Sequence, residues 1–318
     1  MPPSLDIVIV NWNTGSALRA CVDSIAAARA GVALSRVVVV DNASSDDSVA
    51  TATNSVLPIE IVRNHVNLGF AAACNQGARA SAADYLLFLN PDTRLEPDTL
   101  SRTLAFIESP ACADVGICGV HLYDDEGRAS TAAARFPSVR VLLGGATGLS
   151  RVLPRAFPPH LLTSDECGST GEVDQIIGAF FLVRRPMFET LGGFDERFFV
   201  YFEEVDLSLR ARQAGYRSMY FSGARAYHRG GLSSDQIKAT RLFYSLRSRL
   251  LYAFKHFSFF RARVVLVLTF AIEGPARGVH ALARGGGAPA EVVVAYRRLW
   301  DFVRCPGWRL DRIAQRQP

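Results

Sequence analysis

An apolar segment that ends abruptly at a proline is the feature that most constrains how this chain can fold. Residues Tyr85–Leu89 are all aromatic or aliphatic and predict a buried strand. Pro91 has no amide hydrogen to donate to a neighbouring strand, and it disfavours the helical conformation at Asn90. The strand must end here, so Asn90 and Asp92 are expected at its carboxyl end. In open α/β sheets that edge is where ligands bind.

The Asn90-Pro91-Asp92 turn admits two interpretations. A carboxylate and an amide held on a stiff turn can bind a divalent cation and a sugar diphosphate. Alternatively, this is an Asx-Pro turn in which Asp92 caps a helix that starts near Pro97. The turn alone favours the second interpretation, so the rest of the chain must decide.

Apolar segments alternate with helical patterns around this strand. Strands that alternate with helices form βαβ units, so the sequence predicts an α/β fold with a mostly parallel central sheet. The other expected strands are Asp6–Val10, Val37–Val40 and Ile59–Val62, and the expected helices include one that opens at Gly69 and runs through Asn75 and one over Thr99–Ile107.

No glycine-rich phosphate-binding motif follows these strands. Neither Gly-x-Gly-x-x-Gly nor Gly-Lys-Ser/Thr stands at a strand end, which argues against dinucleotide and P-loop sites. Polar side chains at the strand ends must then recognise any ligand. Asp41 lies where a carboxylate could accept a hydrogen bond from a pyrimidine N3–H or a ribose hydroxyl. An Asx turn that caps the next helix explains Asp41 equally well.

The second half of the chain begins with a strand predicted over Val115–Leu122. Asp124–Gly127 predicts a hairpin turn. Residues 136–172 are rich in Pro and Gly and weakly periodic, so we expect a long loop of the kind that acts as a lid or acceptor loop in enzymes. A strand over Gly178–Val183 and a short helix from Pro186 follow.

An acidic helix start follows a run of aromatic residues. Glu203, Glu204 and Asp206 fall in the first turn of a predicted helix, where the helix dipole favours acids. Asp206 stands four residues before Arg210 and can pair with it. The preceding aromatic residues could desolvate a carboxylate and raise its pKa, as a general base requires. The same pattern also fits an acidic helix start beside core aromatics.

His228 stands after a strand predicted from Tyr216 and before the glycines Gly230 and Gly231. A lone histidine is usually structural.

The composition is that of a globular protein. The six cysteines are scattered without zinc spacing, which indicates reduced thiols in a cytosolic compartment. Residues 1–15 carry no basic segment followed by an apolar one, so no signal peptide is expected. No apolar run reaches the roughly 20 residues of a membrane-spanning helix.

Charge is distributed unevenly along the chain. Residues 236–318 carry 15 of the 35 Lys and Arg but 4 of the 30 Asp and Glu, so this tail has a net charge of +11 and the rest has −6. A basic tail suggests an anionic partner such as a membrane, nucleic acid or phosphate. Solvated arginines on C-terminal helices are the competing explanation.

Two apolar segments lie within the tail. A stripe of Leu and Phe at helical spacing, from Leu242 to Phe257, is expected to pack on the catalytic domain. The more hydrophobic segment 259–304 has Arg261 and Arg263 near its start. We expect this segment to make peripheral contact with the cytoplasmic face of a membrane, and we expect no nucleic-acid partner.

Taken in order, these motifs resemble family 2 glycosyltransferases, and among them bacterial rhamnosyltransferase-like members that build cell-surface polysaccharide. The resemblance covers about residues 4–255, and no single motif carries it alone. The matching motifs are Val8-Ile9-Val10-Asn11-Trp12-Asn13, Val39-Val40-Asp41-Asn42-Ala43-Ser44, Asn67-Leu68-Gly69-Phe70, Asn90-Pro91-Asp92, Gly178-Ala179-Phe180 and Tyr201-Phe202-Glu203-Glu204-Val205-Asp206-Leu207.

The resemblance implies a GT-A fold, which is a Rossmann-like nucleotide-sugar-binding fold, and an inverting, metal-dependent transfer from a nucleotide sugar. It implies that Asp41 contacts the pyrimidine and that Asn90 and Asp92 occupy the family's Asp-x-Asp site. It further implies that Glu204 is the general base and that His228 helps to bind the metal or the diphosphate.

Two positions depart from the family pattern. Asn90 replaces the first acid of the Asp-x-Asp site. Glu204 stands where many relatives carry Asp, so the acids Glu203 and Asp206 remain alternatives for the base.

These considerations give a set of candidate site residues. Glu204 and Asp92 are assigned to catalysis, and Asp92 and His228 to the binding of Mg²⁺ or Mn²⁺. The residues assigned to donor binding are Asn11, Asn13, Asp41, Asn67, Asn75 and Asn90.

The expected organisation is a GT-A catalytic domain over residues 1–235 and a basic, mostly helical extension over 236–318. Within the first, residues 1–115 are expected to form the nucleotide-binding half and 116–235 the acceptor half. By resemblance, the donor is dTDP-rhamnose or else a UDP-hexose, and the acceptor is a glycan or a glycan on a polyprenyl diphosphate.

Two other classes of function remain open. One is a catalytically inactive nucleotide-sugar-binding protein, against which the acids Asp92 and Glu204 argue. The other is a nucleotidyltransferase, which would need a glycine-rich, basic loop where Asn11–Thr14 stands.

Overall fold

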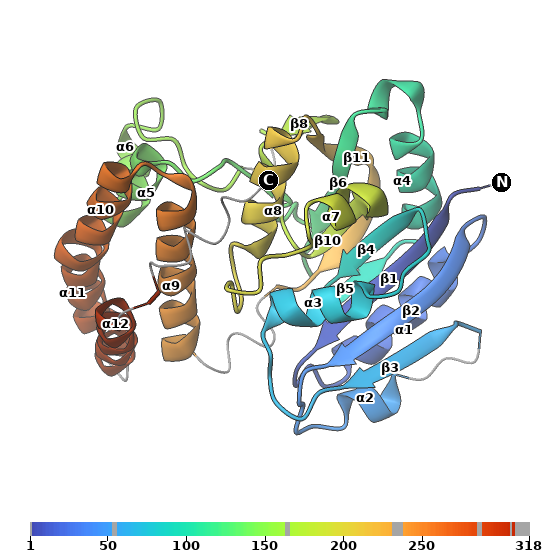
Figure 1. The fold of residues 1–318 in the computed structure, drawn as a ribbon, viewed down its shortest axis with the longest axis horizontal. Coiled ribbons are helices and arrows are strands. Elements are labelled where there is room, and N and C mark those ends of the chain that lie inside the picture. Colours follow the sequence, from blue (N-terminus) through green and yellow to red (C-terminus); the bar gives the residue numbers. More distant parts are fainter. Residues whose placement is uncertain are drawn as a thin grey trace. The chain divides into compact units, whose positions relative to one another are not determined.

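The chain forms two compact units, each assembled from separate stretches of sequence (Figure 1). The computed structural model describes residues 2–52, 56–162, 166–230, 238–284, 288–305 and 307–308. The first unit comprises Met1–Phe136, Leu161–Phe199 and Glu203–Ser233. The second comprises Pro137–His160, Val200–Phe202 and Ser234–Pro318.

The first unit is built on a large mixed sheet (Figure 1). One half of the sheet is entirely parallel, as the sequence predicts. The other half mixes both directions, because strand β10 (Phe180–Arg184) runs antiparallel to its two neighbours. The strands, in spatial order, are β3 (Ile59–Arg63), β2 (Ala33–Asp41), β1 (Ser4–Asn11), β4 (Tyr85–Leu89), β10 (Phe180–Arg184), β6 (Val115–Tyr123), β11 (Arg217–His228) and β5 (Thr93–Leu95), with β8 (Gly171–Val173) also paired to β11.

Helices and a small second sheet complete the first unit. The second sheet pairs β7 (Ala133–Ala134) with β9 (Gln175–Ile176). The helices are α1 (Ala17–Ala28), α2 (Ser48–Thr51), α3 (Phe70–Ala78), α4 (Thr99–Ile107), the 3₁₀ turn η1 (Pro110–Cys112), α7 (Arg185–Thr190) and α8 (Glu203–Gln213).

The core of the first unit lies on both faces of the central strands. The side chains of β4 are all buried, and so are nearly all those of β1, which is the pattern of parallel strands that are covered on each face. Helix α3 approaches this sheet closely at Gly77, where a Cβ would lie 3.1 Å from the side chain of Val40 and nearer still to Val8. The glycine therefore lets α3 rest directly on the sheet.

Residues 136–172 do not form one long loop, so the sequence-based expectation for this segment is wrong. They contain α5 (Val139–Thr147), α6 (Leu149–Val152) and part of β8. The Ser138 side chain caps α5 by accepting a hydrogen bond from the Val141 amide at 3.2 Å, and Gly148 ends it with a left-handed φ of 77°. Residues 163–165 lie outside the described part of the chain.

The second unit is helical. It contains α5, α6, α9 (Lys238–His256), α10 (Phe259–Val267), the π-helix η3 (Leu268–Glu273), α11 (Gly274–Arg284) and α12 (Ala288–Arg304). The Leu and Phe stripe of α9 is buried within this unit against Val265 of α10 and Leu299 of α12. Residues 236–237, 285–287, 306 and 309–318 of the basic tail lie outside the described ranges.

Of the helices within the described ranges, none is both long enough and apolar enough to cross a membrane.

Candidate active site

The carboxyl ends of β1 and β2 place Asn11 and Asp41 directly opposite each other in the sheet register. The buried Asn11 amide donates to Asp41 Oδ1 at 3.2 Å, and also to Ser44 Oγ at 3.0 Å and Ser48 Oγ at 2.8 Å. Asp41 is 8% exposed at this edge. Asn11 thus fixes the orientation of the Asp41 carboxylate from within the core.

Asn13 links the loop after β1 to the loop after β2 by hydrogen bonds. Its side-chain oxygen accepts from the Ser45 backbone amide at 2.7 Å, and its backbone amide donates to Ser44 Oγ at 3.0 Å. Asn13 and Ala43 both have left-handed φ values, of 52° and 65°. The two loops therefore have a fixed shape around Asp41.

A network of side-chain amides shapes the turn before α3. Asn67 Oδ1 accepts from the Asn42 amide and from the Gly69 amide, each at 2.9 Å. Asn42 is 2% exposed and also binds Asn64 and the Leu68 amide. Asn42 is not among the predicted site residues, although its place directly after a buried strand is a signal.

Asn75 of α3 holds a distant loop in place. Its amide nitrogen donates to Phe194 O at 2.8 Å and to Glu196 Oε1 at 3.0 Å, and its oxygen accepts from the Phe194 amide at 2.9 Å. In the described structure Asn75 therefore anchors the loop that leads towards α8. Its assignment to donor binding stays a prediction.

Asp92 and His228 lie side by side although they are far apart in the sequence. β5 pairs with β11 so that Thr93 faces His228, and this brings His228 Nε2 within 3.4 Å of Asp92 Oδ1. Their side chains are 8% and 12% exposed, respectively. Asp92 does not cap α4, because that helix begins at Thr99 with Asp98 in the N-cap position.

This pair suits a shared metal ion. Two adjacent ligand atoms of an octahedral Mg²⁺ or Mn²⁺ ion are about 3 Å apart. The distance of 3.4 Å between His228 Nε2 and Asp92 Oδ1 is close to this value. Within the described residues, no group of three or more acidic, His or Cys side chains could hold a metal by itself. Such a site must complete its coordination with ligand oxygens or water, as Mg²⁺ sites usually do.

Asn90 follows β4 at the same edge. Its backbone amide donates to Ala179 O at 3.0 Å, which fixes the turn to the residue before β10. The half-buried Asn90 side chain makes no hydrogen bond to another described residue. Its amide thus remains able to bind a ligand.

The three acids at the start of α8 differ in their surroundings. Asp206 is fully buried and receives Arg210 Nε at 2.8 Å, while the same guanidinium donates to Leu191 O and Gly193 O. This predicted ion pair is confirmed, and it commits Asp206 to a structural role. Burial raises the pKa of the Cys74 thiol, and the nearby carboxylates of Glu203 and Glu204 raise it further.

Glu203 and Glu204 differ in their exposure to solvent. Glu203 is 5% exposed, whereas Glu204 is half-buried and the more accessible of the two. The residues just before them, Tyr201 and Phe202, have left-handed φ values of 67° and 72°. Such conformations cost about 1–3 kcal/mol each in a residue other than glycine, and they gather at functional sites.

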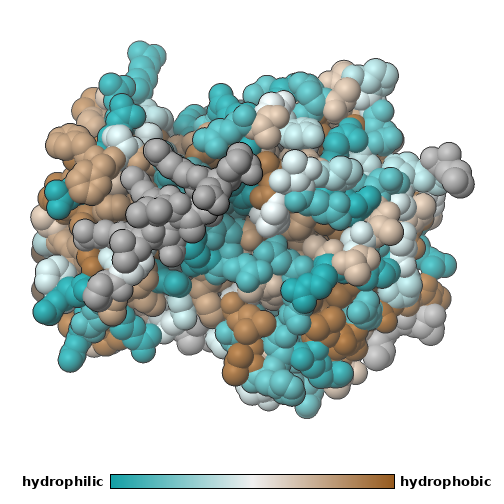
Figure 2. Space-filling model, viewed as in Figure 1, coloured by the Kyte–Doolittle hydropathy of each residue, from teal (hydrophilic) through white to brown (hydrophobic). Residues whose placement is uncertain are grey.

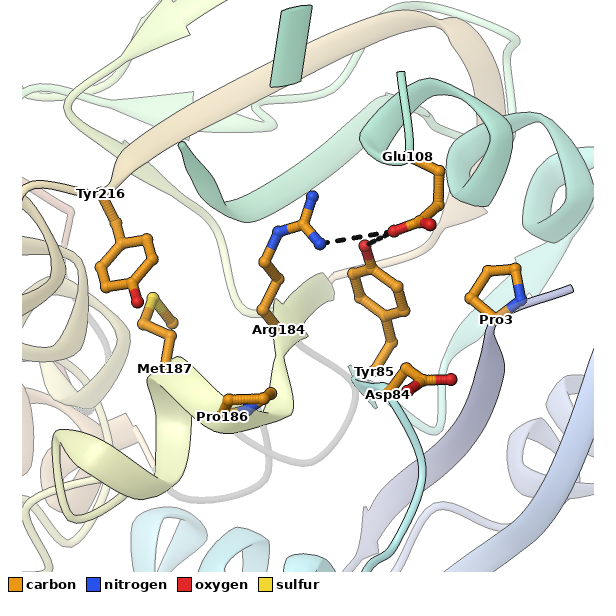
Figure 3. A pocket seen from close by; sticks show the side chains of 8 residues that line it. All are labelled: Pro3, Asp84, Tyr85, Glu108, Arg184, Pro186, Met187 and Tyr216. Carbon is orange, nitrogen blue, oxygen red and sulfur yellow. Dashed lines mark hydrogen bonds and ion pairs between the residues drawn. The ribbon is translucent and has the colours of Figure 1, made fainter. Parts of the chain in front are cut away.

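A cavity of about 320 Å³ lies at the other end of β4 (Figure 3). It is lined by Tyr85 at the amino end of β4, by Glu108 and by Arg184, and none of the predicted site residues borders it. Arg184 Nη1 contacts Glu108 Oε1 at 3.3 Å, and the Tyr85 hydroxyl donates to the same carboxylate. These polar groups satisfy one another, so we assign no ligand to this cavity.

Comparison with known proteins identifies the family of this chain. The model of the glycosyl transferase family 2 matches residues 6–192. An N-acetylglucosaminyl-diphospho-decaprenol L-rhamnosyltransferase of Mycobacterium tuberculosis is 28% identical over 82% of this chain and 88% of its own length. The rhamnosyltransferase WbbL of Escherichia coli is 30% identical over 52% of this chain and 59% of its own length.

Solved structures share the fold at low sequence identity. A mannosyltransferase from Pyrobaculum calidifontis, in complex with GDP-Man and Mn²⁺, superposes with a TM-score of 0.55 at 17% identity over 98% of this chain and 84% of that one. GalNAc-T7 with UDP, GalNAc and Mn²⁺ gives a TM-score of 0.53 at 14% identity over 80% of this chain and 51% of that one.

The mixed sheet, with Asp41 and Asp92 at the carboxyl ends of its parallel strands, and the likeness to the solved mannosyltransferase define the GT-A fold. The chain belongs to glycosyl transferase family 2. The resemblance recognised in the sequence is thereby confirmed.

Proposed function

We propose that this enzyme transfers a sugar with inversion from a nucleotide donor, dTDP-rhamnose in the first place and otherwise a UDP-hexose. The observation that carries the proposal is the meeting of Asp92 and His228 at the same sheet edge as Asp41. The name of the relative from M. tuberculosis supports rhamnose as the sugar and a polyprenyl-diphosphate-linked glycan as the acceptor, in cell-surface polysaccharide synthesis.

The donor would lie along the carboxyl edge of β1, β2 and β4. We assign the pyrimidine to Asp41, which Asn11 orients, and further donor contacts to Asn13, Asn67 and Asn90. Mg²⁺ or Mn²⁺ held by Asp92 and His228 would neutralise the diphosphate as it leaves.

The transfer itself requires one base. Glu204 accepts the proton of the acceptor hydroxyl while that oxygen forms a bond to the anomeric carbon. The bond from this carbon to the diphosphate breaks at the same time, and its electron pair leaves on the nucleoside diphosphate. Because there is one displacement and no covalent intermediate, the anomeric configuration inverts.

The donor can be identified by thermal unfolding. A ligand that binds only the folded state adds about 2.7 kcal/mol to the free energy of unfolding at 100 times its Kd, so the true donor should raise the Tm most. We expect dTDP-rhamnose with Mn²⁺ or Mg²⁺ to give the largest shift in a panel of nucleotide sugars, and EDTA to reduce it. Equal shifts for all nucleotides, with or without metal, would contradict the proposed site, and turnover with the best ligand would exclude an inactive binding protein.

We also propose that the second unit contacts the cytoplasmic face of the membrane where a lipid-linked acceptor would lie. Apolar side chains are exposed over α10 to α12 (Figure 2), and arginines such as Arg261 and Arg263 stand beside them to meet lipid phosphates. The exposed apolar residues of this segment are Phe259, Phe260, Val267, Ile272, Val279, Leu282, Val293, Val294 and Trp300.

The membrane contact can be tested by co-sedimentation with liposomes. Phe260 is 76% and Val279 is 68% exposed, so Phe260→Glu with Val279→Glu should leave the fold intact and lower binding to anionic vesicles by at least about 10-fold. Val56→Glu, at an apolar residue 51% exposed in the first unit, is the matched control. Substitution is preferable to truncation after Phe257, because truncation would strip Leu246 and Leu250 of their packing partners. Unchanged binding by the double variant would remove this segment as the anchor.

A further inference from the structure

We propose that Ser248 and Tyr252 of α9 are positioning residues for the general base, and that they act through the segment Val200–Phe202. This inference rests on the proposed function, because it takes Glu204 as the base. Neither residue belongs to the motifs that mark the family in this sequence, and both lie on a C-terminal helix beyond the matched residues 6–192.

The segment Val200–Phe202 sets the direction in which α8 begins. Tyr201 and Phe202 have consecutive left-handed φ values of 67° and 72°, and α8 starts at the next residue, Glu203. A rotation about either residue would turn the first turn of α8, which carries Glu204. Because residues other than glycine rarely adopt this conformation, neighbouring groups must impose it.

Two buried side chains of α9 hold this segment within the second unit. The Ser248 hydroxyl donates to Val200 O at 2.9 Å, and Ser248 is fully buried. The ring of Tyr252, which is 1% exposed, packs on the ring of Phe202 with their centroids 5.6 Å apart. One contact thus fixes the residue before the left-handed pair and the other fixes its second member.

The chain is also held just before this segment, within the first unit. Phe199 O accepts from the Phe70 amide at 2.6 Å, and Gly69 leaves room for Phe199 because any Cβ there would overlap it. In the chain, the left-handed residues therefore follow closely after an anchored residue, Phe199. Loss of the α9 anchors would let them relax to ordinary φ values and would displace Glu204.

The experiment compares Ser248→Ala, Tyr252→Leu and Tyr252→Phe in the full-length enzyme. Displacement of a reacting group by about 1 Å can cost on the order of 100-fold in rate, so we expect Ser248→Ala and Tyr252→Leu to lower kcat by about 10-fold or more. The KM and the Kd for the donor should not change, because the base acts on the acceptor. Tyr252→Phe keeps the ring on Phe202 and should retain most of kcat.

Two controls on the same helix separate positioning from general destabilisation. Leu246→Ala truncates a side chain that is 2% exposed in the core of the second unit, so it should lower the Tm without a comparable fall in kcat below that Tm. Ser245→Ala removes a half-buried hydroxyl one turn before the anchors and should change neither quantity.

The outcomes distinguish this inference from the proposed function. Wild-type kcat in both Ser248→Ala and Tyr252→Leu overturns the positioning role, and so does an equal loss of kcat in Leu246→Ala. If these variants behave as wild type while Glu204→Gln is inactive, the positioning role fails and the base stands. If Glu204→Gln is active, the base assignment fails, and this inference fails with it.

Discussion

Replacement of Asp92 by asparagine is expected to lower turnover by at least ~100-fold, the scale of losing one group that stabilises developing charge. Asp92 lies within 3.4 Å of His228 Nε2 at the carboxyl edge of the sheet, where a metal and the donor diphosphate would bind. The substitution keeps the shape of the side chain but removes its charge. Steady-state kinetics across a range of Mn²⁺ concentrations measure the effect, and high Mn²⁺ should restore part of the rate.

Asp98→Asn is the matched control for this experiment. Asp98 is an exposed aspartate at the N-cap position of α4, and it pairs with Arg102 at 3.3 Å on the surface. An exposed pair of this kind contributes little to stability, so turnover should stay at the wild-type level. A folded Asp92→Asn enzyme with near wild-type rates at every metal concentration would show that Asp92 does not carry the metal.

Replacement of Glu204 by glutamine is expected to abolish transfer yet leave donor binding largely intact. General base catalysis contributes up to about 10,000-fold to a rate, and glutamine cannot accept the proton. Because Glu204 acts on the acceptor, the loss should appear in kcat, whereas the Kd of the donor should be unchanged. Rapid-quench turnover and calorimetric titration of the donor measure the two quantities separately.

The neighbouring acids provide the comparison for Glu204. Glu203→Gln should have the milder effect on kcat, because Glu203 is 5% exposed and so less accessible to an acceptor. Asp206→Asn should mainly destabilise the protein, since it breaks the buried pair with Arg210. A loss of donor affinity in Glu204→Gln as large as the loss of rate would instead place Glu204 in the donor site.

Local sequence patterns determined most of the strands and helices in the first unit. The strand Tyr85–Leu89 has the bounds that its apolar run and Pro91 predict, because both signals act within a few residues. The strand expected over Ile59–Val62 is observed over Ile59–Arg63, which is one residue longer. Its apolar pattern is also a signal that acts within a few residues. The segment 136–172 has the composition of a loop, but Ser138, which caps α5, is the more informative local signal.

The sequence also predicted which polar residues lie at the carboxyl edge of the sheet, since side chains after parallel strands must share one edge. It could not supply their partners. Asp206 could be expected to pair with Arg210 because four residues on a helix bring side chains together. No such rule brings Asp92 to His228, and their approach depends on the pairing of β5 with β11.

By itself, then, the sequence determined the buried strands, the turn at Pro91 and the acids that begin α8, because these follow from short-range sterics and hydrophobic pattern. The tertiary structure alone decided that Asn75 anchors the Phe194 loop and that α9 holds the left-handed residues before Glu203. The physical reason is that a side-chain hydrogen bond or ring contact depends on where distant segments meet, and sequence spacing does not encode that meeting.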